Sequence, residues 1–156
     1  MTVDWCKCIL QSSCRLNLIN LNTEYFDNLL GVFVIWYENK GGGKIVSVGQ
    51  GIIRDKLIEM QIDKKVQEYG PDLYVTWASV PRVSLEGIEA FLYQKLNPLV
   101  HHSITSCDTI EVNLPQLLMI SKKFRLAYPT ITEVDLELND RDDGNLLARP
   151  QKKLLE

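Results

Sequence analysis

The clearest pattern in this chain is a pair of short apolar runs that are rich in β-branched and aromatic residues. One run covers 31–37 (GVFVIWY) and the other covers 44–48 (KIVSV), and a polar stretch that ends in three glycines lies between them. Such side chains fit a pleated, largely buried surface, and glycine-rich turns commonly join antiparallel strands. The pattern therefore predicts a β-hairpin.

After Gly51 the spacing of apolar residues changes from that of a strand to that of a helix. The apolar stripe consists of Ile53, Leu57, Ile58, Ile62 and Val66. Residues three or four apart share one face of a helix, so this stripe predicts a helix with one buried side. Gly70 and Pro71 end it, because proline cannot continue a helix.

A third strand and a second helix follow. Residues 73–80 (LYVTWASV) alternate as a strand does. The segment 84–98 then places Ile88, Phe91, Leu92 and Leu96 on one helical face, before Asn97 and Pro98 close it. The order strand, strand, helix, strand, helix predicts an α/β (α+β) domain, in which helices flank a small mixed or antiparallel sheet of about three central strands.

Weaker patterns lie outside this central block. They predict a short strand at 5–11, a helical turn at 24–29, another short strand at 110–115, a helix start at 114–124 and a loosely attached polar tail at 139–156.

Composition limits the classes of function. The chain has 156 residues, 46% hydrophobic and 24% charged, with a formal net charge of -3, which fits one globular domain without a global field that attracts nucleic acid. A nucleic-acid site would have to be local. The basic clusters at 64–65 and 122–125 could be such patches or ordinary solvated helix faces.

Without an apolar run of roughly 20 residues or a signal-peptide pattern, we expect a cytoplasmic protein with no membrane association.

The cysteines and histidines give weaker signals. Cys6, Cys8, Cys14 and Cys107 match no familiar zinc spacing, so we expect reduced, largely apolar side chains. His101 and His102 could be read as a metal pair or a general base. Adjacent histidines rarely converge on one ion, however, and their place after Pro98 favours a loop.

The central block resembles the GIY-YIG nuclease superfamily. GVF at 31–33 stands where the family has GIY, and SVG at 47–49 stands where it has YIG. Arg54 follows in the first expected helix and Glu89 lies in the second, as an arginine and a metal-binding glutamate do in the family. Asn113 is similar to the asparagine that often follows that second helix. The resemblance covers residues 28–115 and leaves 1–30 as an N-terminal connector and 116–156 as an extension whose end is expected to be disordered.

The resemblance implies a metal-dependent endonuclease that hydrolyses phosphodiester bonds in DNA. It implies that Glu89 holds Mg²⁺ or Mn²⁺ and that Arg54 contacts a phosphate. Oxygen ligands suit such hard cations, and a guanidinium pairs with phosphate as a charged fork. Metal and cation together stabilise the charge that develops during hydrolysis. On the same basis, the substrate-binding positions are Gly31, Gly49, Gln50 and Asn113.

Both motif tyrosines are replaced in this chain. Phe33 and Ser47 stand at these catalytic motif positions, and phenylalanine has no hydroxyl while serine is shorter by a ring. Tyr69 and Tyr74 are candidates to supply a hydroxyl instead, whereas Tyr37, on the same strand face as Phe33, is roughly 13 Å away and too far to do so unaided. Two hypotheses follow, and the enzymatic status stays open between them: an endonuclease with an altered active site, and a catalytically inactive module that binds nucleic acid or protein on the same fold.

Overall fold

The computed structural model describes residues 1–6, 15–39 and 42–115 of the chain. The expected helix start at 114–124 lies almost entirely outside the described residues, and so does the tail at 139–156. Most of the strand expected at 5–11 lies outside them as well.

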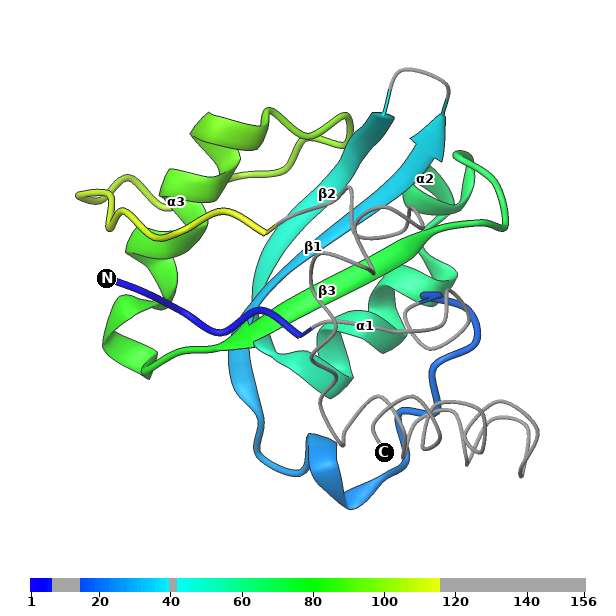
Figure 1. The fold of residues 1–156 in the computed structure, drawn as a ribbon, viewed down its shortest axis with the longest axis horizontal. Coiled ribbons are helices and arrows are strands. Elements are labelled where there is room, and N and C mark those ends of the chain that lie inside the picture. The colour runs from blue at the N-terminus through cyan, green and yellow to red at the C-terminus, as the bar shows by residue number, and fades with distance from the viewer. Residues whose placement is uncertain (7–14, 40–41, 116–156) are drawn as a thin grey trace, which may run out of the picture.

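Three antiparallel strands form the centre of the domain (Figure 1). They are β1 (Leu30–Asn39), β2 (Gly42–Ile52) and β3 (Tyr74–Ser79), in the order β2-β1-β3. In the middle strand, Phe33 pairs with Gly49 of β2 and with Trp77 of β3. The predicted hairpin and third strand are confirmed, and the α+β class with them, although both hairpin strands are longer than expected.

The first helical region consists of two helices, α1 (Ile53–Ile62) and α2 (Lys64–Gln67). Asp63 between them has an extended backbone, and its carboxylate accepts the N–H of Val66 at 3.1 Å. An aspartate in this position caps a new helix and so interrupts the old one. The prediction of one continuous stripe was therefore wrong in part: Ile58 and Ile62 are exposed, Ile62 by 77%.

The second helical region follows its prediction closely. A 3₁₀ turn, η3 (Arg82–Ser84), leads into α3 (Leu85–Leu96). Asn97 ends the helix in a left-handed conformation with φ of 47°, which asparagine tolerates, and Pro98 follows it. Another 3₁₀ turn, η2 (Glu24–Phe26), occupies part of the helical turn expected at 24–29.

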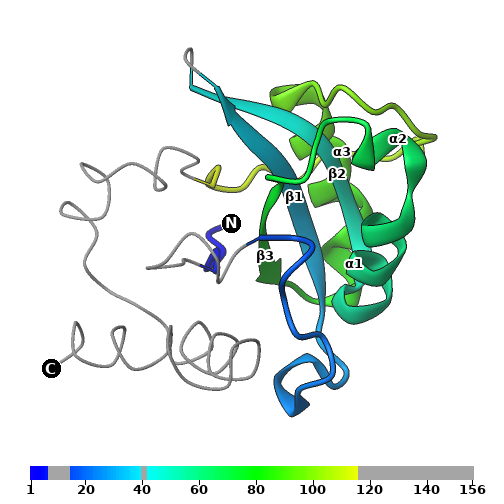
Figure 2. The ribbon, with the colours of Figure 1, turned by 90° about the vertical axis from the view of Figure 1, so that its right-hand side faces the viewer.

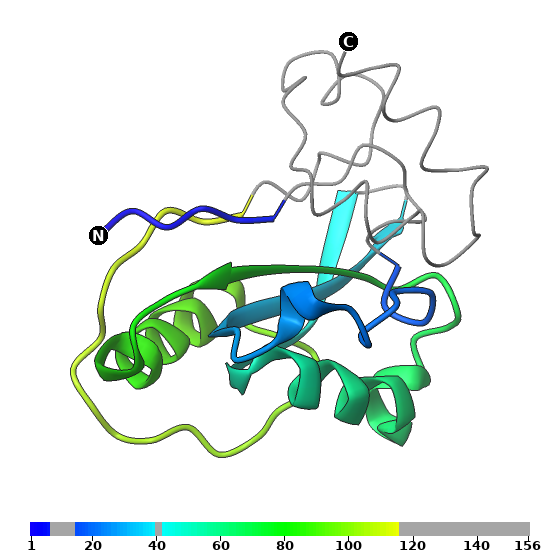
Figure 3. The same cartoon turned by 90° about the horizontal axis from the view of Figure 1, so that it is seen from below.

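Alternate residues of β1 divide between two apolar cores. Phe33 and Ile35 join the core that contains α1 and α2, whereas Val32 and Val34 join the core that contains α3. The division follows from the strand period of two. α1 and α3 accordingly lie well apart, one at each side of the view in Figure 3.

Other parts of the chain cover both edges of the sheet. The N-terminal segment runs beside β3 (Figure 2), where the Cys6 N–H donates to the Trp77 carbonyl at 2.8 Å. On the opposite edge, Leu99 and Val100 donate to carbonyls of β2 at 3.0 and 2.9 Å. Within the described residues the segment at 5–6 makes an isolated bridge at Trp5 and not a strand, and 110–115 forms no strand. Among the helices that the structure describes, none has the length and apolar character needed to cross a bilayer.

Candidate functional site

A cavity of about 600 Å³ lies beside β2, between the hairpin, the first two helices, α3 and the loop after α3. Its walls include Phe33, Ser47, Gly49, Gln50, Lys56, Glu59, Met60, Asp63, Lys64, Lys65, Glu89, Val100, His101 and His102. The structure thus brings together five of the eight site residues that the resemblance implies: Phe33, Ser47, Gly49, Gln50 and Glu89.

The hairpin forms one wall of this cavity. The ring of Phe33 lies so close to Gly49 that a Cβ on Gly49 would collide with it, and this close approach explains the glycine. The Ser47 hydroxyl faces the sulfur of Met60 at 3.9 Å. Of the two motif positions, one has no hydroxyl and the other directs a short hydroxyl at a thioether.

The tyrosines that could have replaced the motif hydroxyls lie elsewhere. Tyr37 stacks on Tyr69 with ring centroids 6.0 Å apart, and Tyr74 packs on Trp36 at 5.8 Å. None of the three tyrosines belongs to the cavity wall. Trp36 and Trp77 are buried core aromatics.

Glu89 is a buried carboxylate on the cavity wall. Its side chain is 9% exposed, and its Oε2 lies 3.3 Å from Nε2 of His102. Burial raises the pKa of the Glu89 carboxyl above its ordinary value, while His102 and Lys56 act in the opposite direction. The helix therefore presents a partly desolvated carboxylate to a cavity that also holds cationic groups.

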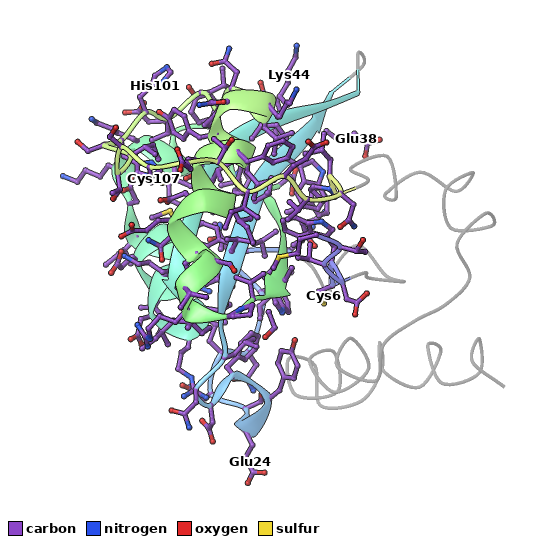
Figure 4. The ribbon with its side chains drawn as sticks, turned by 90° about the vertical axis from the view of Figure 1, so that its left-hand side faces the viewer. Cys6, Glu24, Glu38, Lys44, His101 and Cys107 are labelled. Carbon is purple, nitrogen blue, oxygen red and sulfur yellow. The ribbon has the colours of Figure 1, made fainter. Side chains whose placement is uncertain are left out.

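The loop after α3 carries both histidines, as the sequence predicts. Figure 4 shows His101 and Cys107 along this loop beside α3, on the side of the molecule away from Cys6. The Nδ1 atom of His101 lies 3.0 Å from the Tyr93 hydroxyl, whereas the ring of His102 turns to Glu89. The contact between His102 and Glu89 could not be predicted from the sequence, because it depends on the path of a loop that has no periodic pattern.

Arg54 does not belong to the cavity wall. Its Nε donates to the Leu21 carbonyl at 2.7 Å, and one terminal nitrogen donates to the Thr23 carbonyl at 2.7 Å and to the Asp27 carboxylate at 2.8 Å. These three acceptors belong to the segment that precedes β1. Arg54 thus fastens that connector to α1, and the structure does not bring it to Glu89.

Lysines supply the positive charge in the cavity. Lys56 lies on α1, two residues after Arg54, and Lys64 and Lys65 begin α2. Lys56 also lies 3.6 Å from the Glu59 carboxylate, a partly exposed pair of modest energy. The basic cluster at 64–65 therefore borders the candidate site, and the cluster at 122–125 lies outside the described residues.

The two remaining predicted residues hold the fold together. A Cβ on Gly31 would collide with the backbone of Ala78, so Gly31 allows β1 and β3 to pair closely. Asn113 accepts the Val3 N–H at 2.7 Å and donates to the Val3 carbonyl at 3.0 Å. Neither belongs to the cavity wall.

The donor set at Glu89 is compatible with a divalent cation. A hard cation can be held by one carboxylate when several waters complete its shell, and the open cavity leaves room for them. Within residues 1–6, 15–39 and 42–115, no three His, Cys, Asp or Glu side chains converge as a closed metal site. Any ion at Glu89 would therefore keep several positions for water or substrate.

Fold and site together define a small α+β domain with a three-stranded antiparallel sheet and a cavity of mixed charge. No protein-family model, curated protein or solved structure matches the chain.

Proposed function

We propose that this chain is a divergent GIY-YIG-type domain that hydrolyses phosphodiester bonds in DNA with the help of a divalent metal ion at Glu89. The observation that carries this proposal is the placement of the Glu89 carboxylate in one cavity with both hairpin motif positions and three lysines. A carboxylate that can hold a cation, next to ammonium groups that can hold phosphate, is what phosphodiester hydrolysis requires.

Each residue has a role that follows from its chemistry. Bound Mg²⁺ or Mn²⁺ supplies Lewis-acid stabilisation of the charge that develops on the phosphate. Lys56 takes the phosphate contact that the sequence assigned to Arg54, because its side chain borders the cavity and Arg54 is engaged elsewhere. Lys64 and Lys65 bind flanking phosphates as point charges, and Gln50 offers an amide beside them.

A second candidate function has its own support. Phe33 cannot donate or accept a proton, and the hydroxyl of Ser47 is directed at Met60. If hydrolysis at this cavity depends on the two motif hydroxyls, a domain without them would bind the nucleic-acid backbone and not cut it. The alternative is therefore a catalytically inactive binding module on the same fold.

Cleavage and binding assays on one set of variants separate the two functions. Plasmid, single-stranded and branched DNA are incubated with Mg²⁺ or Mn²⁺, and binding is measured in EDTA. If the domain is a hydrolase, Glu89→Gln lowers the cleavage rate by roughly a hundredfold or more, because it removes the metal-binding carboxylate. Glu111→Gln is the matched control, since Glu111 is exposed and is not part of the cavity wall.

The outcomes are distinct. Equal cleavage by wild type and Glu89→Gln would rule out hydrolysis at this site. Salt-sensitive binding that survives EDTA, without cleavage of any substrate, would establish the binding module. Gain of cleavage in the double variant Phe33→Tyr, Ser47→Tyr would then show that the scaffold lacks nothing but the hydroxyls.

A further inference from the structure

The loop after α3 brings an imidazole to the carboxylate of Glu89. Nε2 of His102 lies 3.3 Å from Oε2 of Glu89, and both residues border the cavity. We infer that His102 is a second protein ligand of the metal ion. The site therefore prefers a transition metal that binds nitrogen ligands over Mg²⁺. This inference rests on the proposed metal site at Glu89.

The separation of the two donor atoms suits a shared ion. Nitrogen and oxygen ligands lie about 2.0–2.2 Å from a first-row divalent metal, so two donors at octahedral or tetrahedral angles are roughly 2.8–3.6 Å apart. The observed 3.3 Å lies within that range. An ion about 2.0–2.2 Å from both atoms lies off the line that joins them, so the two side chains need to rotate toward it but not to move apart.

His102 is held in place by its neighbours. Its backbone N–H donates to the Tyr93 hydroxyl at 3.3 Å, and the two rings meet edge to face with centroids 5.4 Å apart. Two residues earlier, the Val100 N–H donates to the Val46 carbonyl at 2.9 Å and fixes the loop on β2. A ligand that its surroundings orient in this way loses little freedom when it binds a metal.

Ligand chemistry decides which metal such a pair prefers. Mg²⁺ favours oxygen ligands and water, whereas imidazole suits Zn²⁺, Co²⁺, Ni²⁺ and, more weakly, Mn²⁺. Two protein ligands leave the other coordination positions open for water and a phosphate oxygen, as catalytic metal sites require. A carboxylate alone would not discriminate in this way.

Spectroscopy on the full chain, without an affinity tag, tests the inference. Electron spin-echo modulation of Mn²⁺ added alone is expected to show coupling to an imidazole nitrogen in the wild type. His102→Ala should abolish that coupling and weaken Co²⁺ binding in calorimetry by about tenfold or more, with Mg²⁺ binding changed less than about twofold. His101→Ala is the comparison variant and should keep the nitrogen coupling, because the His101 ring contacts Tyr93 and not Glu89.

The results separate this inference from the proposed function. Mn²⁺ binding that is lost in Glu89→Gln but shows no nitrogen coupling in the wild type would overturn His102 as a ligand and leave the metal site at Glu89 standing. Equal Co²⁺ affinity in wild type and His102→Ala would overturn it as well. Nitrogen coupling that depends on His102, in a protein that cleaves no DNA, would support the ligand and contradict the hydrolytic function.

Discussion

Arg54 and Glu89 were predicted to share one site, yet their surroundings differ completely. The guanidinium of Arg54 has three protein acceptors, all in the connector before β1. The carboxylate of Glu89 borders a cavity and has His102 as its hydrogen-bond partner. One charge is used within the fold and the other is available to a ligand.

The difference shows how a charged residue becomes structural. Arg54 lies on α1, and its acceptors are 27 to 33 residues earlier in the chain. Charge-assisted hydrogen bonds to backbone carbonyls replace water well, so they fix the connector and leave the guanidinium with few free donors. A charge can act on a ligand when the fold leaves one side of it open, as it does for Glu89 and Lys56.

The largest expected effect is the loss of stability in Arg54→Met. Removal of the three hydrogen bonds takes the guanidinium donor from the Leu21 carbonyl and leaves the Thr23 carbonyl with the Phe26 N–H, so we expect the free energy of unfolding to fall by about 3 kcal/mol. Urea denaturation measures it. The metal affinity at Glu89 should stay the same, because Arg54 is not part of the cavity wall.

Arg82→Met is the control for that experiment. Arg82 is exposed in η3, so its replacement should change stability by no more than about 0.5 kcal/mol. If Arg54→Met kept full stability but lost DNA binding, Arg54 would act on the ligand after all, and the contrast with Glu89 would collapse.

An intermediate effect is expected for Lys56→Ala. The ammonium group of Lys56 contacts a phosphate in the proposed function, so its loss should weaken binding of a DNA oligonucleotide by roughly tenfold and reduce the slope of log affinity against log salt by about 1. Fluorescence anisotropy at several salt concentrations measures both quantities. Lys44→Ala removes the same charge from an exposed position outside the cavity wall and should have little effect. Equal losses in the two variants would mean that binding depends on general charge and not on the cavity.

The sequence predicted the sheet well because local patterns determine it. The apolar runs at 31–37 and 44–48, the glycines between them and the alternation at 73–80 all correspond to observed strands. The single helix expected through Val66 was wrong because the capping carboxylate of Asp63 restarts the helix there. Aspartate is a preferred N-cap residue, so Asp63 is the signal in the sequence for a new helix at this position.

The site was less predictable than the fold. Glu89 lies on the cavity wall because the apolar face of α3 fixes the position and rotation of that helix against the sheet. The roles of Arg54 and His102 depend on segments with no regular pattern, namely the connector before β1 and the loop after α3. Tertiary contacts of such segments are set by the whole fold, so spacing along the chain could not reveal them.

The smallest expected effect concerns the pH dependence of stability at Glu89, and it tests the open side of the comparison. Burial, which exceeds the opposing effects of His102 and Lys56, raises the pKa of Glu89 in the folded state. The folded protein therefore holds more protons than the unfolded chain above the ordinary pKa of glutamate, and this residue's contribution to stability falls as the pH rises through the raised pKa. Glu89→Gln removes that dependence, because an amide does not titrate. Urea denaturation of both proteins in EDTA, from about pH 4 to pH 7, should show the variant gaining stability relative to the wild type as the pH rises. If the difference in the free energy of unfolding stays constant, or shifts in favour of the wild type, burial does not destabilise the charged carboxylate. Glu89 would then be a charge that the fold satisfies, as Arg54 is.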